Sequence, residues 1–195
     1  MLKSRIKSAF FCVKKIFIID INLHILTLDV CYYTPILLKG GNKVNYDYEI
    51  NSETLAILPI DGKKCLVLQS MDEETVVGTP KKIIEKSCEY FGSSYEGRVK
   101  GTVSILGGGT HKVPIVICDY CDIIFFPTLS PDRKECIWLS YQNILSFTQN
   151  EDNDTVIQFK NGKKLIIPIS ILSLSNQYLR SSRLATVLSN RKIQK

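Results

Sequence analysis

Thr155-Val-Ile-Gln-Phe-Lys-Asn161-Gly162-Lys-Lys-Leu-Ile-Ile-Pro168 decides the fold class of this chain. Two alternating or apolar runs flank the dipeptide Asn161-Gly162, a pattern that is typical of a β-hairpin. Asn-Gly favours a two-residue type I′ turn, because both residues readily adopt the positive φ angles that this turn needs. The stretch therefore predicts two antiparallel strands joined at residues 161 and 162.

Further strands are predicted on the N-terminal side of this hairpin. Residues 54–59 and 64–69 predict a second hairpin, joined by the turn residues Asp61-Gly62. Residues 92–98 are predicted to form a loop. Short apolar runs between turn residues predict the remaining strands near residues 99–106, 112–117, 123–127, 136–140 and 144–149.

Two helices are predicted, one central and one C-terminal. Thr79 suits an N-cap, Pro80 the first helical position and Gly92 the residue after the end, which predicts a helix over about 80–91. Ser170 caps a second helix over about 171–190. Apolar residues at helical spacing predict the buried faces of the two helices: Ile83, Ile84, Cys88 and Phe91 in the first, and Ile171, Leu174, Tyr178, Ala185 and Leu188 in the second.

Together these elements predict the α+β class, as a mainly antiparallel β-sheet or barrel-like domain that carries the two helices. The 195 residues are 45% hydrophobic and 23% charged, which excludes disordered, collagen-like and low-complexity proteins. No linker or internal repeat divides residues 44–195, so a single domain is expected there.

Residues 1–43 are expected to lie outside this fold. Charged and polar residues interrupt their apolar runs, so neither a transmembrane helix nor a secretory signal is predicted. Lys39-Gly40-Gly41 is what a bacterial ribosome-binding sequence would encode, and the alternative start codon GTG is one codon for Val44. The natural chain is therefore hypothesised to begin at position 44 as Met, and the intact mass of natively expressed protein tests this. The alternative is a genuine amphipathic N-terminal arm.

Candidate sites for enzyme chemistry are weak. Cys118-Asp-Tyr-Cys121 has the spacing of a zinc half-site or redox pair, but no second pair of ligands matches it. Cys88 and His111 would suit a nucleophile and base, yet Cys88 lies on an apolar stripe, where burial makes a thiol inert. The glycines before Lys112 lack the spacing of a phosphate-binding loop. We therefore expect no enzyme, no metal site and no cofactor.

Two groups of mostly basic residues are candidates for binding a polyanion. Residues 155–195 carry eight Lys or Arg and no Asp or Glu, whereas residues 44–154 are net acidic. An ordinary solvated surface is the alternative for either group alone, but together they favour nucleic acid. The first group surrounds the predicted central helix and the glycine turn: Lys82, Lys86, Arg98, Lys100, His111 and Lys112. The second lies on one face of the C-terminal helix: Asn176, Arg180 and Arg183.

A series of motifs spans roughly residues 46–190. The longest is Lys82-Ile-Ile-Glu-Lys-Ser-Cys-Glu-Tyr-Phe-Gly-Ser-Ser-Tyr-Glu-Gly-Arg98. Two motifs come before it and the rest follow in order: Tyr48-Glu-Ile-Asn51, Ala56-Ile-Leu-Pro59, Gly101-Thr102, His111-Lys-Val-Pro-Ile115, Phe125-Phe-Pro-Thr-Leu-Ser130, Trp138-Leu-Ser140, Phe159-Lys-Asn-Gly162, Pro168-Ile-Ser170 and Asn176-Gln177. This ordered set resembles the ComK family, the competence transcription factors of Bacillus, Listeria, Staphylococcus and relatives.

The resemblance implies a cytoplasmic, sequence-specific DNA-binding activator of the genes for DNA uptake and recombination. It implies double-stranded DNA with AT-rich promoter boxes as the partner, contacts largely in the minor groove, homo-oligomers, RNA polymerase as a further partner and no membrane. Arg98, Arg180 and Arg183 are the leading candidates to enter the groove, where a narrow A-tract concentrates negative potential. The seven dispersed cysteines fit a reducing cytoplasm.

Two features depart from the family pattern. Family members commonly continue past the final helix in a tail that serves adaptor-mediated proteolysis and activation, whereas this sequence stops at Lys195. A proteolytic adaptor is therefore a doubtful partner, and a truncated, activation-defective factor is one alternative function. The pair Cys118/Cys121 is also not part of that pattern. A β-rich protein-interaction module is the other alternative.

Overall fold

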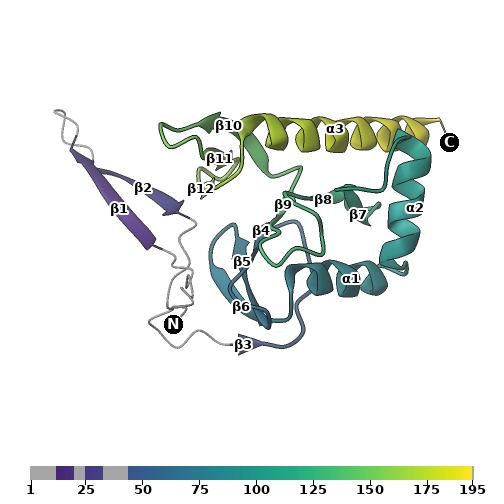
Figure 1. Ribbon diagram of the computed structural model, residues 1–195, viewed down its shortest axis with the longest axis horizontal. Helices are drawn as coiled ribbons and strands as arrows, with labels where there is room; N and C mark the ends of the chain where they lie inside the picture. Colours follow the sequence, from purple (N-terminus) through teal and green to yellow (C-terminus); the bar gives the residue numbers. More distant parts are fainter. Residues whose placement is uncertain (1–11, 20–24, 33–43, 195) are drawn as a thin grey trace, which may run out of the picture.

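The computed structural model describes residues 12–19, 25–32 and 44–194 (Figure 1). In these residues the larger of two sheets has seven strands, in the order β3-β6-β5-β4-β9-β8-β7. Neighbouring strands are antiparallel except for β3 and β6, which are parallel. The strands of this sheet are β3 (Val44–Asn45), β4 (Thr54–Pro59), β5 (Lys64–Gln69), β6 (Glu73–Val77), β7 (Ile115–Cys118), β8 (Ile123–Pro127) and β9 (Trp138–Ser140).

The smaller sheet has five strands in the order β1-β2-β12-β11-β10. Its strands are β1 (Cys12–Ile19), β2 (Ile25–Tyr32), β10 (Ile144–Gln149), β11 (Thr155–Phe159) and β12 (Lys164–Ile167). Strand β2 runs parallel to β12, and the other neighbours are antiparallel. Residues 1–11, 20–24 and 33–43 of the predicted leader lie outside the described residues, and the start at position 44 stays a prediction.

Both predicted helices are confirmed, with the predicted caps. Helix α1 (Pro80–Tyr90) begins after Thr79, whose Oγ1 accepts a hydrogen bond from the Lys82 amide at 3.2 Å. Gly92 follows the helix with a φ of 74°, which few other residues tolerate. Helix α3 (Ile171–Ile193) begins after Ser170, which accepts from the Ser173 amide at 3.3 Å, and it continues past the predicted end.

The predicted strand near residues 99–106 and the loop before it are wrong. Residues Tyr95–Leu106 form a helix, α2, which stands between the ends of α1 and α3 in Figure 1. Ser94 caps it by accepting a hydrogen bond from the Gly97 amide at 3.0 Å. Val99 and Val103 lie four residues apart and pack on the core, so the apolar period is helical although the β-branched residues and glycines of this segment have low helix propensity.

The 161–162 turn also differs from the prediction. Gly162 has a φ of 86°, but Asn161 is not among the residues with positive φ, so the turn is not type I′. The Phe159 carbonyl accepts from the Gly162 amide at 2.9 Å, and the Phe159 amide donates to the Lys163 carbonyl at 2.9 Å. This is a type I turn followed by a glycine bulge, and it leaves the Asn161 side chain free to donate to the Ser70 carbonyl at 3.0 Å.

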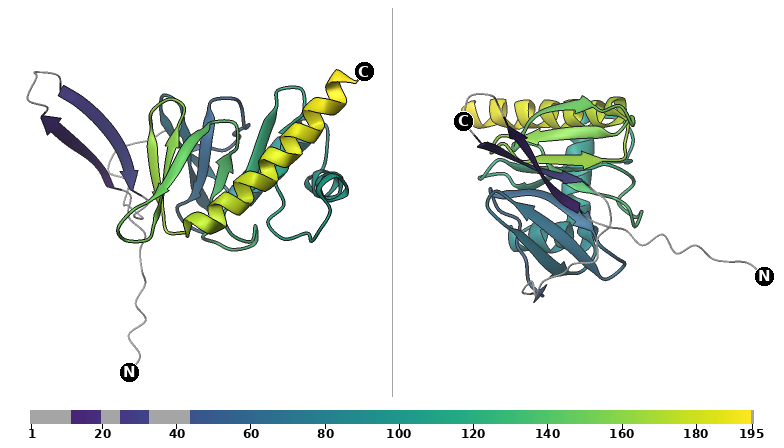
Figure 2. Two further views of the ribbon diagram at one scale, coloured as in Figure 1. Left: turned by 90° about the horizontal axis from the view of Figure 1, so that it is seen from above. Right: turned by 90° about the vertical axis from the view of Figure 1, so that its left-hand side faces the viewer.

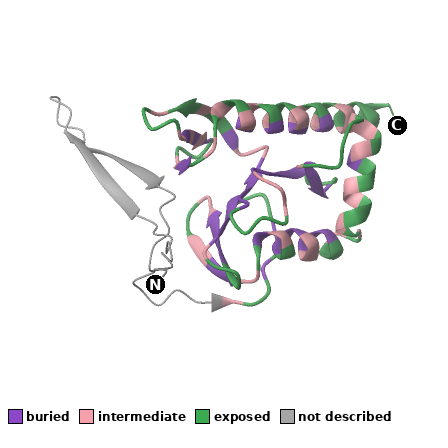
Figure 3. Ribbon diagram, in the orientation of Figure 1, coloured by how far each residue is buried: buried purple, intermediate pink, exposed green. Residues whose placement is uncertain are grey.

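The seven-stranded sheet lies between two layers, and all six residues of β4 are buried (Figure 3). Ile57 faces a core shared with Ile84 of α1. Leu58 faces a second core shared with Ile157 of the smaller sheet. Over β7 and β8, α3 takes the place of the smaller sheet, as the view from above shows (Figure 2). The described strands therefore form two open sheets rather than a barrel, and the α+β class is confirmed.

Candidate nucleic-acid interface

The C-terminal end of α2 and the middle of α3 meet at one corner of the domain. Ile105 and Leu106 of α2 pack with Ala185 of α3 over the buried strand residues Val116 and Ile124. The chain then leaves α2 through residues 107–112, here called the glycine loop, in which two of the glycines have positive φ. This packing places a flexible basic loop beside a basic helix.

Arg180 joins the glycine loop to α3. Its Nη1 donates to the backbone carbonyl of His111 at 3.0 Å and to that of Lys112 at 3.3 Å. The side chain is therefore half-buried and engaged with backbone, whereas the sequence placed it on a free face opposite the apolar stripe. The structure thus brings His111 and Lys112 of the first predicted group together with the second group.

The remaining members of the second group are solvent-exposed. Asn176 lies one turn before Arg180, and Arg183 lies one turn after it. We call the surface formed by His111, Lys112, Asn176, Arg180 and Arg183 the basic corner. Helix α3 carries no acidic residue, so its own side chains do not neutralise the corner. A concentration of basic side chains of this kind attracts a polyanion.

The two α1 lysines lie elsewhere. Helix α1 packs on the face of the large sheet that is opposite to the face covered by α3. Lys82 is exposed, while Lys86 Nζ forms an ion pair with Asp47 Oδ1 at 3.1 Å. The structure therefore does not bring Lys82 and Lys86 into the basic corner.

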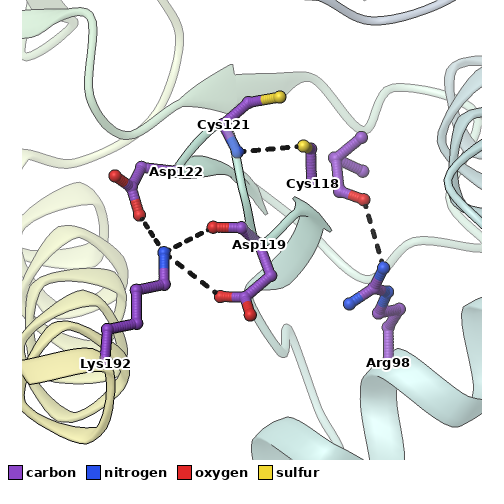
Figure 4. A network of polar contacts seen from close by, with 7 residues as sticks. Arg98, Cys118, Asp119, Cys121, Asp122 and Lys192 are labelled. Atoms are coloured by element: carbon purple, nitrogen blue, oxygen red, sulfur yellow. Dashed lines mark hydrogen bonds and ion pairs between the residues drawn. The ribbon is translucent and has the colours of Figure 1, made fainter. Parts of the chain in front are cut away.

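Arg98 of α2 is turned toward β7 rather than into solvent (Figure 4). Its Nη2 donates to the Ile117 carbonyl at 3.5 Å, and its Nε is buried without a hydrogen-bond partner in the described residues. Lys100, two residues further along α2, is exposed. Of these two predicted contacts, Lys100 is the more exposed and Arg98 is half-buried.

Cys88 and His111, which the sequence analysis rejected as a nucleophile and base, lie in opposite environments. Cys88 is fully buried and His111 is exposed on the glycine loop. Burial raises the pKa of the Cys88 thiol to about 11, and the Arg98 charge opposes only part of that rise. A buried, protonated thiol is a poor nucleophile. Among the described residues, no group of three or more His, Cys, Asp or Glu side chains is placed to hold a metal ion.

Sequence reasoning missed a contact that holds the other end of α3. Lys192 Nζ forms ion pairs with Asp122 Oδ1 at 2.7 Å and Asp119 Oδ1 at 3.5 Å, both in the β7–β8 turn (Figure 4). In the sequence, the only signs of this contact are the basic residues in the last turn of α3, which has no acidic residue, and two aspartates that lie 70 or more positions earlier. In the described part of the chain, no helix has the length and apolar character to cross a membrane.

Comparison with known proteins gives the family. The family model described as "ComK protein" matches residues 45–193. The Competence transcription factor of Bacillus subtilis (strain 168) is 40% identical over 147 residues, which are 74% of this chain and 76% of that relative. No solved structure matches the chain. The motifs found in the sequence and these two matches agree, and the chain belongs to the ComK family.

Proposed function

We propose that this protein is a sequence-specific DNA-binding activator of competence genes, and that it binds AT-rich promoter boxes through the basic corner. The observation that carries the proposal is the 40% identity to a competence transcription factor over most of both chains. The geometry supports the location, because Arg180 holds the glycine loop against α3 and so collects basic side chains from distant parts of the sequence.

The chemistry of the basic corner suits a narrow minor groove. AT-rich tracts narrow this groove and concentrate negative potential in it, which favours an inserted arginine. Arg183 is the exposed arginine of the corner, so we assign it the groove contact. Lys112 and Lys100 then contact phosphates on either side, which fixes position without reading sequence.

The same function requires further partners. Paired boxes call for a homo-oligomer with one basic corner per site, and activation calls for contact with RNA polymerase in the cytoplasm. Neither partner is needed for the DNA contact itself. Binding and activation are therefore tested separately.

The binding test is a fluorescence anisotropy titration of matched AT-rich and GC-rich duplexes over a range of salt concentrations. We expect tighter binding to the AT-rich duplex. For each phosphate that the protein neutralises, the logarithm of the association constant should fall by about 0.9 for every tenfold rise in salt concentration. A variant that changes Lys112 and Arg183 to Ala should lose much of this binding. The matched control changes the exposed Lys63 and Lys160 and should keep it.

Two outcomes would favour the alternatives. No duplex binding at low salt would contradict the proposal and point to a protein-interaction module. Selective AT binding without transcription from a competence promoter in a reporter strain would support the DNA contact and indicate an activation-defective factor.

A further inference from the structure

The β7–β8 turn places two thiols together at the protein surface. Strand β7 ends at Cys118, and the chain reverses through Asp119–Asp122, where Asp122 has a φ of 55°. The Cys121 amide donates a hydrogen bond to Cys118 Sγ at 3.0 Å. Figure 4 shows the two sulfurs on the same side of the Cys121 backbone. The turn therefore holds both thiols on one side of the backbone.

The two thiols differ in their access to solvent. Cys118 is 4% exposed and packs in the core on the α1 side of the sheet, whereas Cys121 is exposed. The pKa of the Cys121 thiol lies above its ordinary value, chiefly because of its hydrogen bond with the Cys118 side chain. The pair thus consists of one accessible sulfur in contact with one shielded sulfur.

The other cysteines between residues 44 and 194 are poor competitors for an oxidant. Cys65, Cys88 and Cys136 are buried in the core. Burial raises the pKa of Cys65 to about 12 and those of Cys88 and Cys136 to about 11, so these thiols stay protonated. Oxidation also requires access of the oxidant to the sulfur, and the exposure of Cys121 makes it the site of first attack in this part of the chain.

We propose that Cys118 and Cys121 form a redox-active pair, which hydrogen peroxide converts into an intrachain disulfide. The Cys121 thiol releases its proton, the thiolate attacks one peroxide oxygen and the O–O bond breaks. The departing hydroxide takes up the released proton, so the products are Cys121 sulfenic acid and water. The Cys118 sulfur then attacks the sulfenic sulfur, the S–S bond forms, and hydroxide leaves with the thiol proton as a second water. The two sulfurs supply the two electrons that reduce the peroxide.

The disulfide alters the turn that anchors α3. It requires a sulfur–sulfur distance of about 2.0 Å and a restricted dihedral angle, which constrains the backbone between residues 118 and 121. Asp119 lies in that segment, and its carbonyl oxygen accepts from Lys192 Nζ at 2.5 Å. Oxidation should therefore loosen the last turns of α3, whether or not the protein binds DNA.

Peptide mapping of the full chain tests the disulfide. The protein is treated with hydrogen peroxide, alkylated under denaturing conditions and digested with trypsin, which releases residues 113–133 with both cysteines. We expect this peptide to be unalkylated and lighter by two hydrogen atoms. In Cys118→Ala, Cys121 should instead be trapped as a sulfenic acid by dimedone. Two alkylated cysteines after peroxide, or equal dimedone labelling of parent and variant, would overturn the proposal.

Hydrogen exchange tests the link to α3. After peroxide, amides of residues 186–194 should exchange faster in the parent protein and at an unchanged rate in Cys121→Ser. Lys192→Met should reproduce the faster exchange without oxidant. Unchanged exchange in a parent sample that mass spectrometry shows to be oxidised would overturn the link.

Discussion

Arg180 Nη1 donates a hydrogen bond to the backbone carbonyl of His111 at 3.0 Å, across 69 positions of sequence. The same nitrogen lies 3.3 Å from the Lys112 carbonyl. The glycine loop contains residues with positive φ and few internal constraints, so this side chain limits where its basic residues lie. Arg180 therefore positions the glycine loop within the basic corner.

Arg180→Ala should therefore affect stability as well as DNA binding. Loss of charge-assisted hydrogen bonds to two carbonyls should lower the free energy of unfolding by about 1–2 kcal/mol, measured by urea denaturation. Affinity for an AT-rich duplex should fall in the same variant, because the loop is released. An unchanged urea midpoint would contradict the tie between α3 and the loop.

Arg183→Ala should separate the two effects. The side chain is exposed and has no hydrogen-bond or ion-pair partner among the described residues, so the free energy of unfolding should change by less than about 0.5 kcal/mol. Duplex affinity should fall, and the slope of log affinity against log salt should decrease by about 1 if the lost contact is to a phosphate. Lys160→Ala serves as the exposed control on the β11–β12 turn. Equal affinities for parent and Arg183→Ala would place the DNA elsewhere.

The buried core thiols should make stability depend on alkaline pH. Burial raises the pKa of Cys65 to about 12 and that of Cys88 to about 11, from an ordinary value of 9.0. The unfolded chain ionises first, so this contribution is fully present below pH 9 and is lost as pH rises toward the folded values. Each thiol should remove up to about 1.4 kcal/mol per pH unit in that range.

Urea unfolding between about pH 8 and about pH 10, with a reducing agent present, measures this loss. Cys65→Ala should be less stable at every pH because it leaves a cavity, but its stability should fall less steeply above pH 9. A slope identical to that of the parent would show that the pKa of Cys65 is the same in the folded and unfolded chain, and would contradict the prediction.

The parts of the fold that could be predicted rest on short-range contacts. Thr79 and Ser170 cap helices by bonding amides three residues away, so their sequence neighbourhood was sufficient. Helix α2 was missed because Gly97, Val99 and Gly101 favour other structures, whereas burial of its apolar side against the core decides the outcome. That burial depends on strands far away in sequence.

The residues of the candidate site could likewise be predicted from the sequence, whereas the contacts between them could not. The sequence located basic residues in α3 and around the glycine loop, but the partner of Arg180 is a backbone carbonyl, which carries no sequence signal. The contact of the Arg98 guanidinium with the Ile117 carbonyl also depends on a strand that follows later in the chain. The partners of Lys192 likewise follow only from the position of the β7–β8 turn.

The turn at Gly162 offers a direct test of the difference between the predicted and observed hairpin. Gly162 has a φ of 86°, and an added Cβ would meet no atom within 4 Å, so the cost of Gly162→Ala is conformational alone. It should lower the free energy of unfolding by about 1–2 kcal/mol in urea denaturation. Gly62 also has open space around its Cα but no positive φ. Gly62→Ala should therefore be neutral or stabilising by up to about 1 kcal/mol, because it restricts only the unfolded chain. Equal effects of the two substitutions would show that the bulge at Gly162 is not present in solution.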